Sequence, residues 1–272
     1  MNMNNIDTRI DKAFARLRET GQKGFVAYIT AGDPDLSQTE KQVDTLIKAG
    51  VDVIELGIPF SDPLADGKVN QESAMRALAA GTTLGGIFDM VQSCRQRHDI
   101  PIMCYCYMNL LYAPGFERTI KKAVRAGVDG MLILDLPAEE GGAYADQLHA
   151  AGLNNITLIT PTTPDKRIRT ITRHASGFVY AVSRTGVTGM QTSLSTDAND
   201  LLKRAREVTS LPLALGFGIS TPAQAAAAAR HADAVVVGSA IVQQFHQAGR
   251  SAAKYKQVEQ WVRSMVEAVK EV

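Results

Sequence analysis

The sequence is poor in cysteine, in aromatic residues and in net charge, and each shortage argues against a class of protein. Its 272 residues include three cysteines, an odd number without metal-type spacing, which favours buried, reduced thiols over a disulfide framework or a metal site. Aromatic residues make up 6% of the chain, too few for a protein that stacks single-stranded bases. The 29 basic and 28 acidic residues leave a net charge of +1, which gives no strong field for nucleic acid or a membrane surface.

Long apolar runs are also missing. No stretch approaches the ~18 apolar residues that a membrane-spanning helix needs. The first residues lack a basic segment followed by an apolar one, so they do not resemble a secretory signal. We therefore expect a soluble, cytoplasmic protein.

The chain does contain a regular alternation of short apolar runs and amphipathic helical stretches, the signal of repeated βα units. The expected strands are Gly24–Thr30, Asp52–Ile58, Pro101–Tyr107, Gly130–Leu134, Asn155–Thr160, Gly177–Ser183, Leu211–Gly216 and Ala234–Gly238. The expected helices are Ile6–Glu19, Leu36–Ala49, Asn70–Ala80, Leu84–Arg97, Phe116–Ala126, Ala138–Ala151, Pro164–His174, Thr196–Val208, Pro222–His231 and Ser251–Val272.

Eight such units without a composition break predict an α/β fold, a single (β/α)8 TIM barrel over residues 1–272 with an extra N-terminal helix and an additional C-terminal helix. An open doubly wound sheet is the alternative. That fold usually carries a glycine-rich turn after its first strand, and residues 31–35 do not show the dinucleotide-binding pattern.

Glu55 interrupts the apolar second strand. An unpaired carboxylate costs several kcal/mol to bury, roughly, so this side chain must be paired, protonated or directed into a cavity. Asp62 and Asp66 follow in the next loop. Carboxyl groups at the carboxyl end of a barrel strand are typical of an acid/base site, whereas a structural Glu held by a Lys or Arg is the alternative.

Two glycine-rich segments follow the last two strands, at 216–220 and 238–240. Glycine lets the backbone approach a ligand, and helix N-termini favour anions, so these segments predict a phosphate site. A pair of tight turns would also explain them. The small-residue segment 183–189 after the sixth strand is either a flexible connection or a mobile lid.

Other catalytic classes lack their motifs. The five histidines show no metal-ligand spacing, and the chain has no nucleophile elbow, no Gly-Lys phosphate loop and no strand-borne lysine. The residues therefore predict metal-free acid/base chemistry, driven by carboxylates, on a phosphorylated small molecule.

The thirteen residues Glu55–Gly67, ELGIPFSDPLADG, resemble the signature of the tryptophan synthase alpha chain. The similarity extends in order over nearly the whole chain, including segments 25–34, 127–137, 183–189, 216–220 and 238–242. It implies a lyase that cleaves indole-3-glycerol phosphate to indole and glyceraldehyde 3-phosphate without a cofactor. It also implies a partner, the pyridoxal-phosphate-dependent beta chain, which receives the indole in an α2β2 complex.

The resemblance further implies roles for individual residues. Glu55 would transfer protons, and Asp66 would accept a hydrogen bond from the indole N–H. The substrate-binding residues would be Tyr28, Tyr105, Tyr107, Leu132, Ile159, Tyr180, Thr188, Gly189, Gly216, Phe217, Gly218, Gly238 and Ser239. The residues facing the beta chain would be Pro59, Phe60, Asp62, Asn109 and Pro137.

Three positions depart from the familiar pattern of the family. Tyr28 stands where Phe is familiar, Tyr105 where Leu is, and Leu134 where Ala is. These larger or more polar side chains should change the size of the indole pocket. Three alternatives remain open: a paralogue that releases indole without a beta chain, a non-catalytic activating subunit, and another phosphate-binding barrel enzyme such as an isomerase or a synthase.

Overall fold

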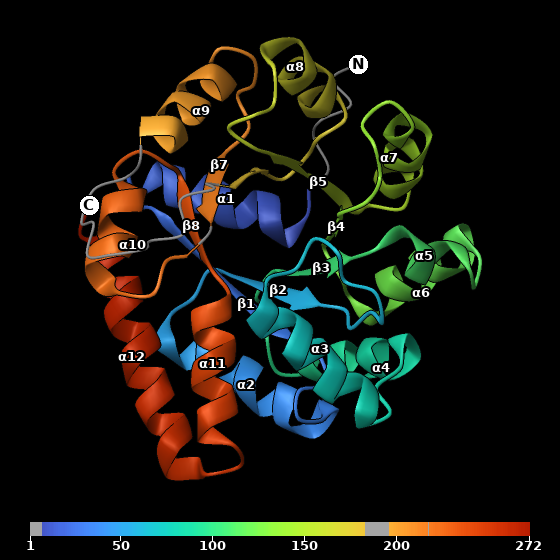
Figure 1. The fold of residues 1–272 in the computed structure, drawn as a ribbon, viewed down its shortest axis with the longest axis vertical. Coiled ribbons are helices and arrows are strands. Elements are labelled where there is room, and N and C mark those ends of the chain that lie inside the picture. The colour runs from blue at the N-terminus through green and yellow to red at the C-terminus, as the bar shows by residue number, and fades with distance from the viewer. Residues whose placement is uncertain (1–6, 183–195, 217) are drawn as a thin grey trace.

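The apolar runs form eight parallel strands that close into a barrel in chain order, β1 to β8 (Figure 1). The computed structural model describes residues 7–182, 196–216 and 218–272. The strands are β1 (Gly24–Thr30), β2 (Val53–Gly57), β3 (Ile102–Cys106), β4 (Gly130–Ile133), β5 (Asn154–Ile159), β6 (Val179–Val182), β7 (Leu213–Gly216) and β8 (Ala234–Val237). Every expected strand is present, with ends shifted by at most one or two residues, and the predicted TIM barrel is confirmed.

Helices surround the barrel. They are α1 (Arg9–Glu19), α2 (Leu36–Ala49), α3 (Lys68–Ala79), α4 (Leu84–Arg95), α5 (Met108–Tyr112), α6 (Phe116–Ala126), α7 (Gly141–Ala150), α8 (Asp165–Arg173), α9 (Thr196–Arg206), α10 (Pro222–Ala229), α11 (Ser239–Ala248) and α12 (Ala252–Lys270). All ten expected helices are present, including the extra ones at the two ends. Two helices, α5 and α11, were not expected; the segment 238–240, interpreted as a loop, contains the start of α11.

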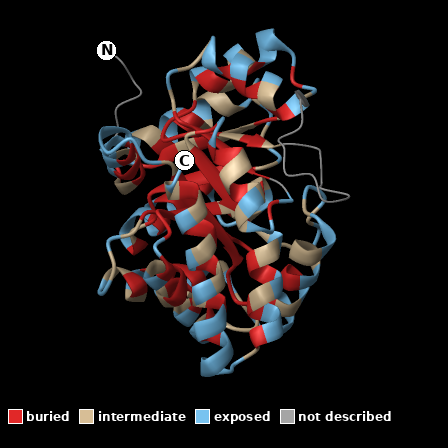
Figure 2. Cartoon of the chain, turned by 90° about the vertical axis from the view of Figure 1, so that its left-hand side faces the viewer, coloured by how far each residue is buried: buried red, intermediate tan, exposed pale blue. Residues whose placement is uncertain are grey.

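Alternation along each strand divides the apolar core into two layers. The larger cluster lies between the strands and the helices, and includes Ile54 and Leu56 of β2. The smaller cluster fills the barrel and includes Val53 of β2 and Met103 of β3. Figure 2 shows the strands as a buried centre with exposed residues on the outer helices. Since successive strand residues face opposite sides, each strand offers every second residue to the barrel interior.

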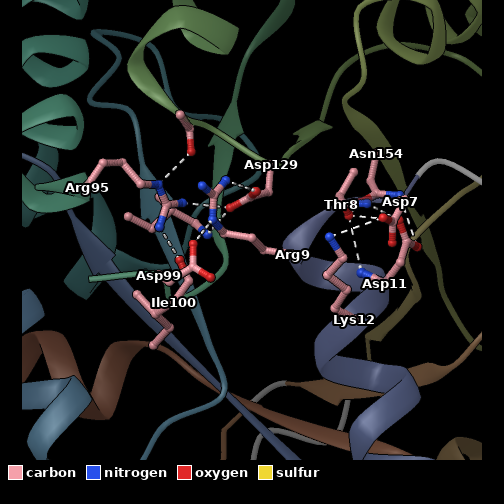
Figure 3. Close-up of polar contacts among 12 residues, drawn as sticks. Asp7, Thr8, Arg9, Asp11, Lys12, Arg95, Asp99, Ile100, Asp129 and Asn154 are labelled. Carbon is pink, nitrogen blue, oxygen red and sulfur yellow. Dashed lines mark hydrogen bonds and ion pairs between the residues drawn. The ribbon is translucent and has the colours of Figure 1, made fainter. Parts of the chain in front are cut away.

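Helix α1 closes the end of the barrel where the strands begin. Its apolar residues Ile10, Phe14 and Leu17 belong to the interior cluster. The Thr8 side chain caps α1 by accepting from the Asp11 amide and donates to Asn154 at the start of β5 (Figure 3). The opposite end, where the strands finish, is therefore the open one.

An ion-pair network joins that closed end to the helical layer (Figure 3). Asp129, almost fully buried before β4, accepts from Arg95 Nη2 at 2.6 Å and from Arg9 Nη1 at 3.0 Å. It also accepts from the Ile102 amide at 2.8 Å. Arg9 additionally pairs with the exposed Asp99.

The three cysteines are free and buried, as expected. Cys104 and Cys106 belong to the outer cluster, while Tyr105 between them packs against the interior cluster, which is the alternation predicted from sequence. Burial raises the pKa of the Cys104 thiol to about 12, so this thiol is unreactive near neutral pH. Among the residues that the structure describes, no helix has the length and apolarity required to cross a membrane.

Candidate active site

Glu55 directs its carboxyl group into the barrel interior. It lies two residues after the inward-facing Val53, in register with Tyr28 of β1 and Met103 of β3. Only 1% of Glu55 is exposed, and neither carboxyl oxygen has a hydrogen-bond partner within the described residues. Burial, with a smaller contribution from the charge of Asp66, raises the pKa of Glu55 to about 8. The alternative of a structural Glu held by a cation has no support in this geometry.

Asp66 lies in the loop between β2 and α3 with both carboxylate oxygens occupied. Tyr105 donates to Oδ1 at 3.0 Å, and Tyr107 donates to Oδ2 at 2.8 Å. Burial raises the pKa of Asp66, although hydrogen bonds from Tyr107, Tyr105 and Asn70 act in the opposite direction. Asp66 is therefore a pre-placed acceptor beside the Glu55 carboxyl group.

Strand-end glycines make room for two interior tyrosines. A methyl group at Gly57 would overlap the ring and hydroxyl of Tyr28, and one at Gly216 would lie 2.6 Å from the Tyr180 hydroxyl oxygen. Tyr28 also packs edge-on against Tyr105, with ring centroids 5.3 Å apart. The barrel mouth is thus lined with phenol groups whose pKa values burial raises, so they act as hydrogen-bond donors rather than as bases.

The apolar wall of the interior comes from β4 and β5. Leu132 is buried in the interior cluster, and Leu134 packs against it. The expectation for Ile159 requires a correction: Ile159 lies in the outer cluster, whereas its neighbour Leu158 faces the interior beside Tyr180. The period-two alternation of β5 separates the two positions, and the sequence interpretation was one residue out of phase.

A cavity of about 390 Å³ opens beside this wall. The last paired residues of β4 and β5 are Leu132 and Ile156. The residues that line the cavity run from Leu132 and Leu158 in the barrel interior to Arg167 of α8. Neither Glu55 nor Asp66 lines it. Leu132 is paired with Tyr105, the donor to Asp66, so the cavity adjoins the carboxyl groups, which define the candidate active site.

The expected phosphate residues lie at the ends of β7 and β8. Gly216 ends β7, and Gly218 has a φ of 71°, a left-handed conformation that suits glycine. Gly238 precedes α11, and Ser239 is its first residue. The first turn of this ten-residue helix therefore points unpaired backbone donors away from α11. Thr188, Gly189 and Phe217 lie outside the described residues.

The expected partner residues lie in three segments that follow strands: the loop between β2 and α3, helix α5, and the loop between β4 and α7. Phe60 stacks on Tyr107, with ring centroids 5.0 Å apart, while Pro59 is buried. Asp62, Asn109 and Pro137 are exposed. Leu64 in the same loop as Phe60 is 85% exposed, and Tyr112 of α5 is 63% exposed.

Sequence reasoning missed two members of the site. Asn70 gives a side-chain hydrogen bond to Asp66; its spacing of four residues from Asp66 at a helix start was the available signal. Gly57 was part of the motif, but its contact with Tyr28 follows only from strand register. Among the described residues, no group of three or more His, Cys, Asp or Glu side chains could hold a metal ion.

Comparison with known proteins identifies the family. The sequence profile described as "Tryptophan synthase alpha chain" matches residues 14–270. The chain belongs to the tryptophan synthase alpha chain family. The alpha chain of Geotalea daltonii is 50% identical over 239 residues, covering 88% of this chain and 90% of the relative. The alpha chain of Geobacter sulfurreducens is 48% identical over 238 residues, covering 88% and 90%.

A solved structure agrees with the sequence relatives. Tryptophan synthase subunit alpha from Legionella pneumophila superposes with a TM-score of 0.90 at 34% identity, covering 97% of this chain and 99% of that one. The resemblance carried by Glu55–Gly67 is thereby confirmed, and so are the lyase class and the link to tryptophan biosynthesis.

Proposed function

We propose that this chain cleaves indole-3-glycerol phosphate to indole and glyceraldehyde 3-phosphate, the alpha reaction of tryptophan synthesis. The observation that carries the proposal is Glu55, a buried carboxyl group without a partner in the described chain, beside the pre-placed acceptor Asp66. Membership of the alpha chain family supports the same reaction and disfavours a non-catalytic subunit.

Glu55 performs the proton transfers of this retro-aldol cleavage. The glycerol hydroxyl next to the scissile bond loses its proton, the indole carbon gains one, and the carbon–carbon bond between them breaks. A carboxyl group whose pKa is raised to about 8 can both give and take a proton near neutral pH. Asp66 accepts the indole N–H and stabilises the positive charge that develops on the ring.

The remaining contacts hold the substrate. The interior tyrosines and Leu132 enclose the indole ring, with Leu158 in the place first given to Ile159. Backbone donors at Gly216, Gly218, Gly238 and Ser239 bind the phosphate, supported by the N-terminus of α11. Thr188, Gly189 and Phe217 complete this site in the proposal.

The test is direct. Purified protein is given indole-3-glycerol phosphate, and indole and glyceraldehyde 3-phosphate are both measured. The proposal expects the two products in equal amounts, with no added cofactor. A protein that releases neither product, alone or with a beta chain, would not be an alpha-reaction enzyme.

We also propose that this chain forms a complex with a beta chain in the cytoplasm. A pyridoxal-phosphate-dependent beta chain docks on the face formed by Pro59, Phe60, Asp62, Asn109 and Pro137, giving an α2β2 assembly. The exposed apolar side chains of Leu64 and Tyr112 on this face support docking, because large exposed apolar groups mark interaction surfaces. Sedimentation of a mixture with a beta chain tests the complex: co-sedimentation supports it, and two independent species at micromolar concentration contradict it.

A further inference from the structure

Tyr105 and Tyr107 hold the two oxygens of Asp66 from opposite ends of the carboxylate. The hydroxyl of Tyr105 lies 3.0 Å from Oδ1, and the hydroxyl of Tyr107 lies 2.8 Å from Oδ2. Each oxygen of an ionised carboxylate can accept more than one hydrogen bond. The tyrosines therefore fix the orientation of Asp66 and still leave acceptor capacity for a ligand N–H.

The two tyrosines are not equivalent. The Tyr107 hydroxyl also accepts from the Ala65 amide at 3.0 Å, so it ties Asp66 to its own loop. Tyr105 is a residue of β3, paired with Gly57 of β2, and its only described hydrogen-bond partner through the hydroxyl is Asp66. Tyr105 thus connects the loop carboxylate to the barrel wall.

The ring of Tyr105 is held in place. Tyr28 packs against it at 79° with a centroid separation of 5.3 Å, close to the edge-to-face geometry that aromatic pairs favour. Tyr28 is itself confined by Gly57. The donor is therefore pre-positioned before any substrate arrives.

We propose that Tyr105 is a positioning residue, which acts through Asp66 by holding its carboxylate ionised and aimed at the indole N–H. This inference rests on the proposed function and extends it, since the site then contains a third working group, the Tyr105 hydroxyl, beyond the two carboxyl groups. Hydrogen bonds to the charged form favour ionisation of a carboxyl group. Because the charge of Asp66 contributes to the raised pKa of Glu55, Tyr105 also influences the proton-transfer group indirectly.

The electrostatic surroundings of Asp66 come from several strands and one loop. The charge of Asp66 acts on Tyr28 of β1, on Glu55 of β2, on Tyr105 of β3 and on Tyr107 directly after β3, while Tyr180 of β6 acts on Tyr105 and Asp135 after β4 acts on Tyr107. Burial raises the pKa of Asp66, whereas the hydrogen bonds from Tyr107, Tyr105 and Asn70 stabilise its charged form. Removing one donor should therefore raise the pH at which Asp66 ionises.

The experiment compares Tyr105→Phe with the wild type and with Tyr28→Phe. Each of these two variants lacks one phenol hydroxyl of the same pocket. Of Tyr105 and Tyr28, only Tyr105 donates a hydrogen bond to Asp66. For Tyr105→Phe we expect kcat to fall about tenfold, KM to change less, and the acid limb of the kcat/KM–pH profile to move upward by up to about one pH unit. In Tyr28→Phe the acid limb stays in place, and in Tyr107→Phe it moves as in Tyr105→Phe.

A second readout does not depend on turnover. Carbon-13 NMR of the Asp66 carboxyl group in the unliganded chain should show its pKa raised in Tyr105→Phe and unchanged in Tyr28→Phe. Tyr105→Leu, which also lacks the hydroxyl, provides the same comparison if the phenylalanine variant does not fold. An unchanged Asp66 pKa, or a change confined to KM, would make Tyr105 only a wall of the pocket and overturn the inference. Failure of the wild type to release indole would instead refute the proposed function, and the NMR comparison separates the two results.

Discussion

Asp66 and Glu55 are electrostatically coupled at the mouth of the barrel. Glu55 is buried and, within the described chain, unpaired, and the charge of Asp66 adds to the effect of burial in raising the pKa of Glu55. The two carboxyl groups differ in their partners, since Asp66 accepts two tyrosine hydroxyls. These different environments suit the different roles that we propose for the two groups, proton transfer by Glu55 and acceptance of the indole N–H by Asp66.

Replacing Glu55 by Gln should abolish turnover while retaining the shape of the side chain. We expect kcat to fall by about 10²- to 10⁴-fold, the usual contribution of a general acid or base. Substrate affinity, measured by calorimetry, should remain within a few-fold. Glu117→Gln is a suitable control because Glu117 is exposed and pairs with Lys121 on α6. Near-full activity in Glu55→Gln would show that another group transfers the proton.

The same substitution should change how stability depends on pH. The pKa of Glu55 is raised from 4.5 to about 8 on folding, so between these values the native state holds a proton that the unfolded state has lost. The stabilisation is thus complete below about pH 4.5 and is lost as the pH rises toward 8, at about 1.4 kcal/mol per pH unit at most.

Urea denaturation of the wild type and Glu55→Gln at pH 5, 6, 7 and 8 measures this contribution. The difference between the two proteins should change by roughly 3 kcal/mol over this range, in favour of Glu55→Gln at high pH. All other titrating groups are common to both proteins and cancel in the comparison. Parallel curves would mean that Glu55 does not hold a proton in the native state.

Asp129 should be important for stability rather than for catalysis. It is 3% exposed and neutralises Arg95, whose side chain is 10% exposed. Asp129→Asn leaves that guanidinium without its counter-charge and should cost about 3–5 kcal/mol in urea denaturation. Asp99→Asn is the matched control, since the Asp99 side chain is 88% exposed and should contribute less than about 1 kcal/mol. An equal loss of stability in Asp129→Asn and Asp99→Asn would show that burial does not determine how much each carboxylate contributes.

Leu64 should contribute to partner binding and not to folding. Its 85% exposure means that Leu64→Asp removes little packing, whereas a charge on a docking face should weaken beta-chain binding at least tenfold. Val272→Asp, beyond α12, is the control. Isothermal titration with a beta chain measures both affinities, and thermal melting of the isolated chain should be unchanged. Equal affinity of Leu64→Asp and wild type would place the interface elsewhere.

The barrel was predictable because its signal is local. Each strand is a short apolar run, and its ends are marked by glycine or proline, so even a four-residue strand such as Ala234–Val237 could be found. Helix α5 is only five residues long, too short to show a helical period. Helix α11 did carry a period, with Ile241, Val242 and Phe245 on its buried face, but the glycine-serine start suggested a loop.

The candidate active site was predictable only in part. Glu55 was conspicuous because a carboxyl group within an apolar strand requires an explanation. The hydrogen bond from Tyr105 to Asp66 joins residues 39 positions apart, and no local pattern encodes it. The choice between Leu158 and Ile159 depends on the phase of a strand, which a run of mostly apolar residues does not reveal.

The contact between Tyr28 and Gly57 also restricts how this sequence can evolve. A side chain at position 57 would occupy the space of the Tyr28 ring, because Tyr28 is paired with Glu55, two residues before Gly57 on the neighbouring strand. Mutations at the two sites are therefore not independent: while an aromatic ring stands at 28, glycine is the accepted residue at 57. A lineage could acquire a larger residue at 57 only after the ring at 28 had been replaced, so the order of substitutions is set by the geometry of one strand pair.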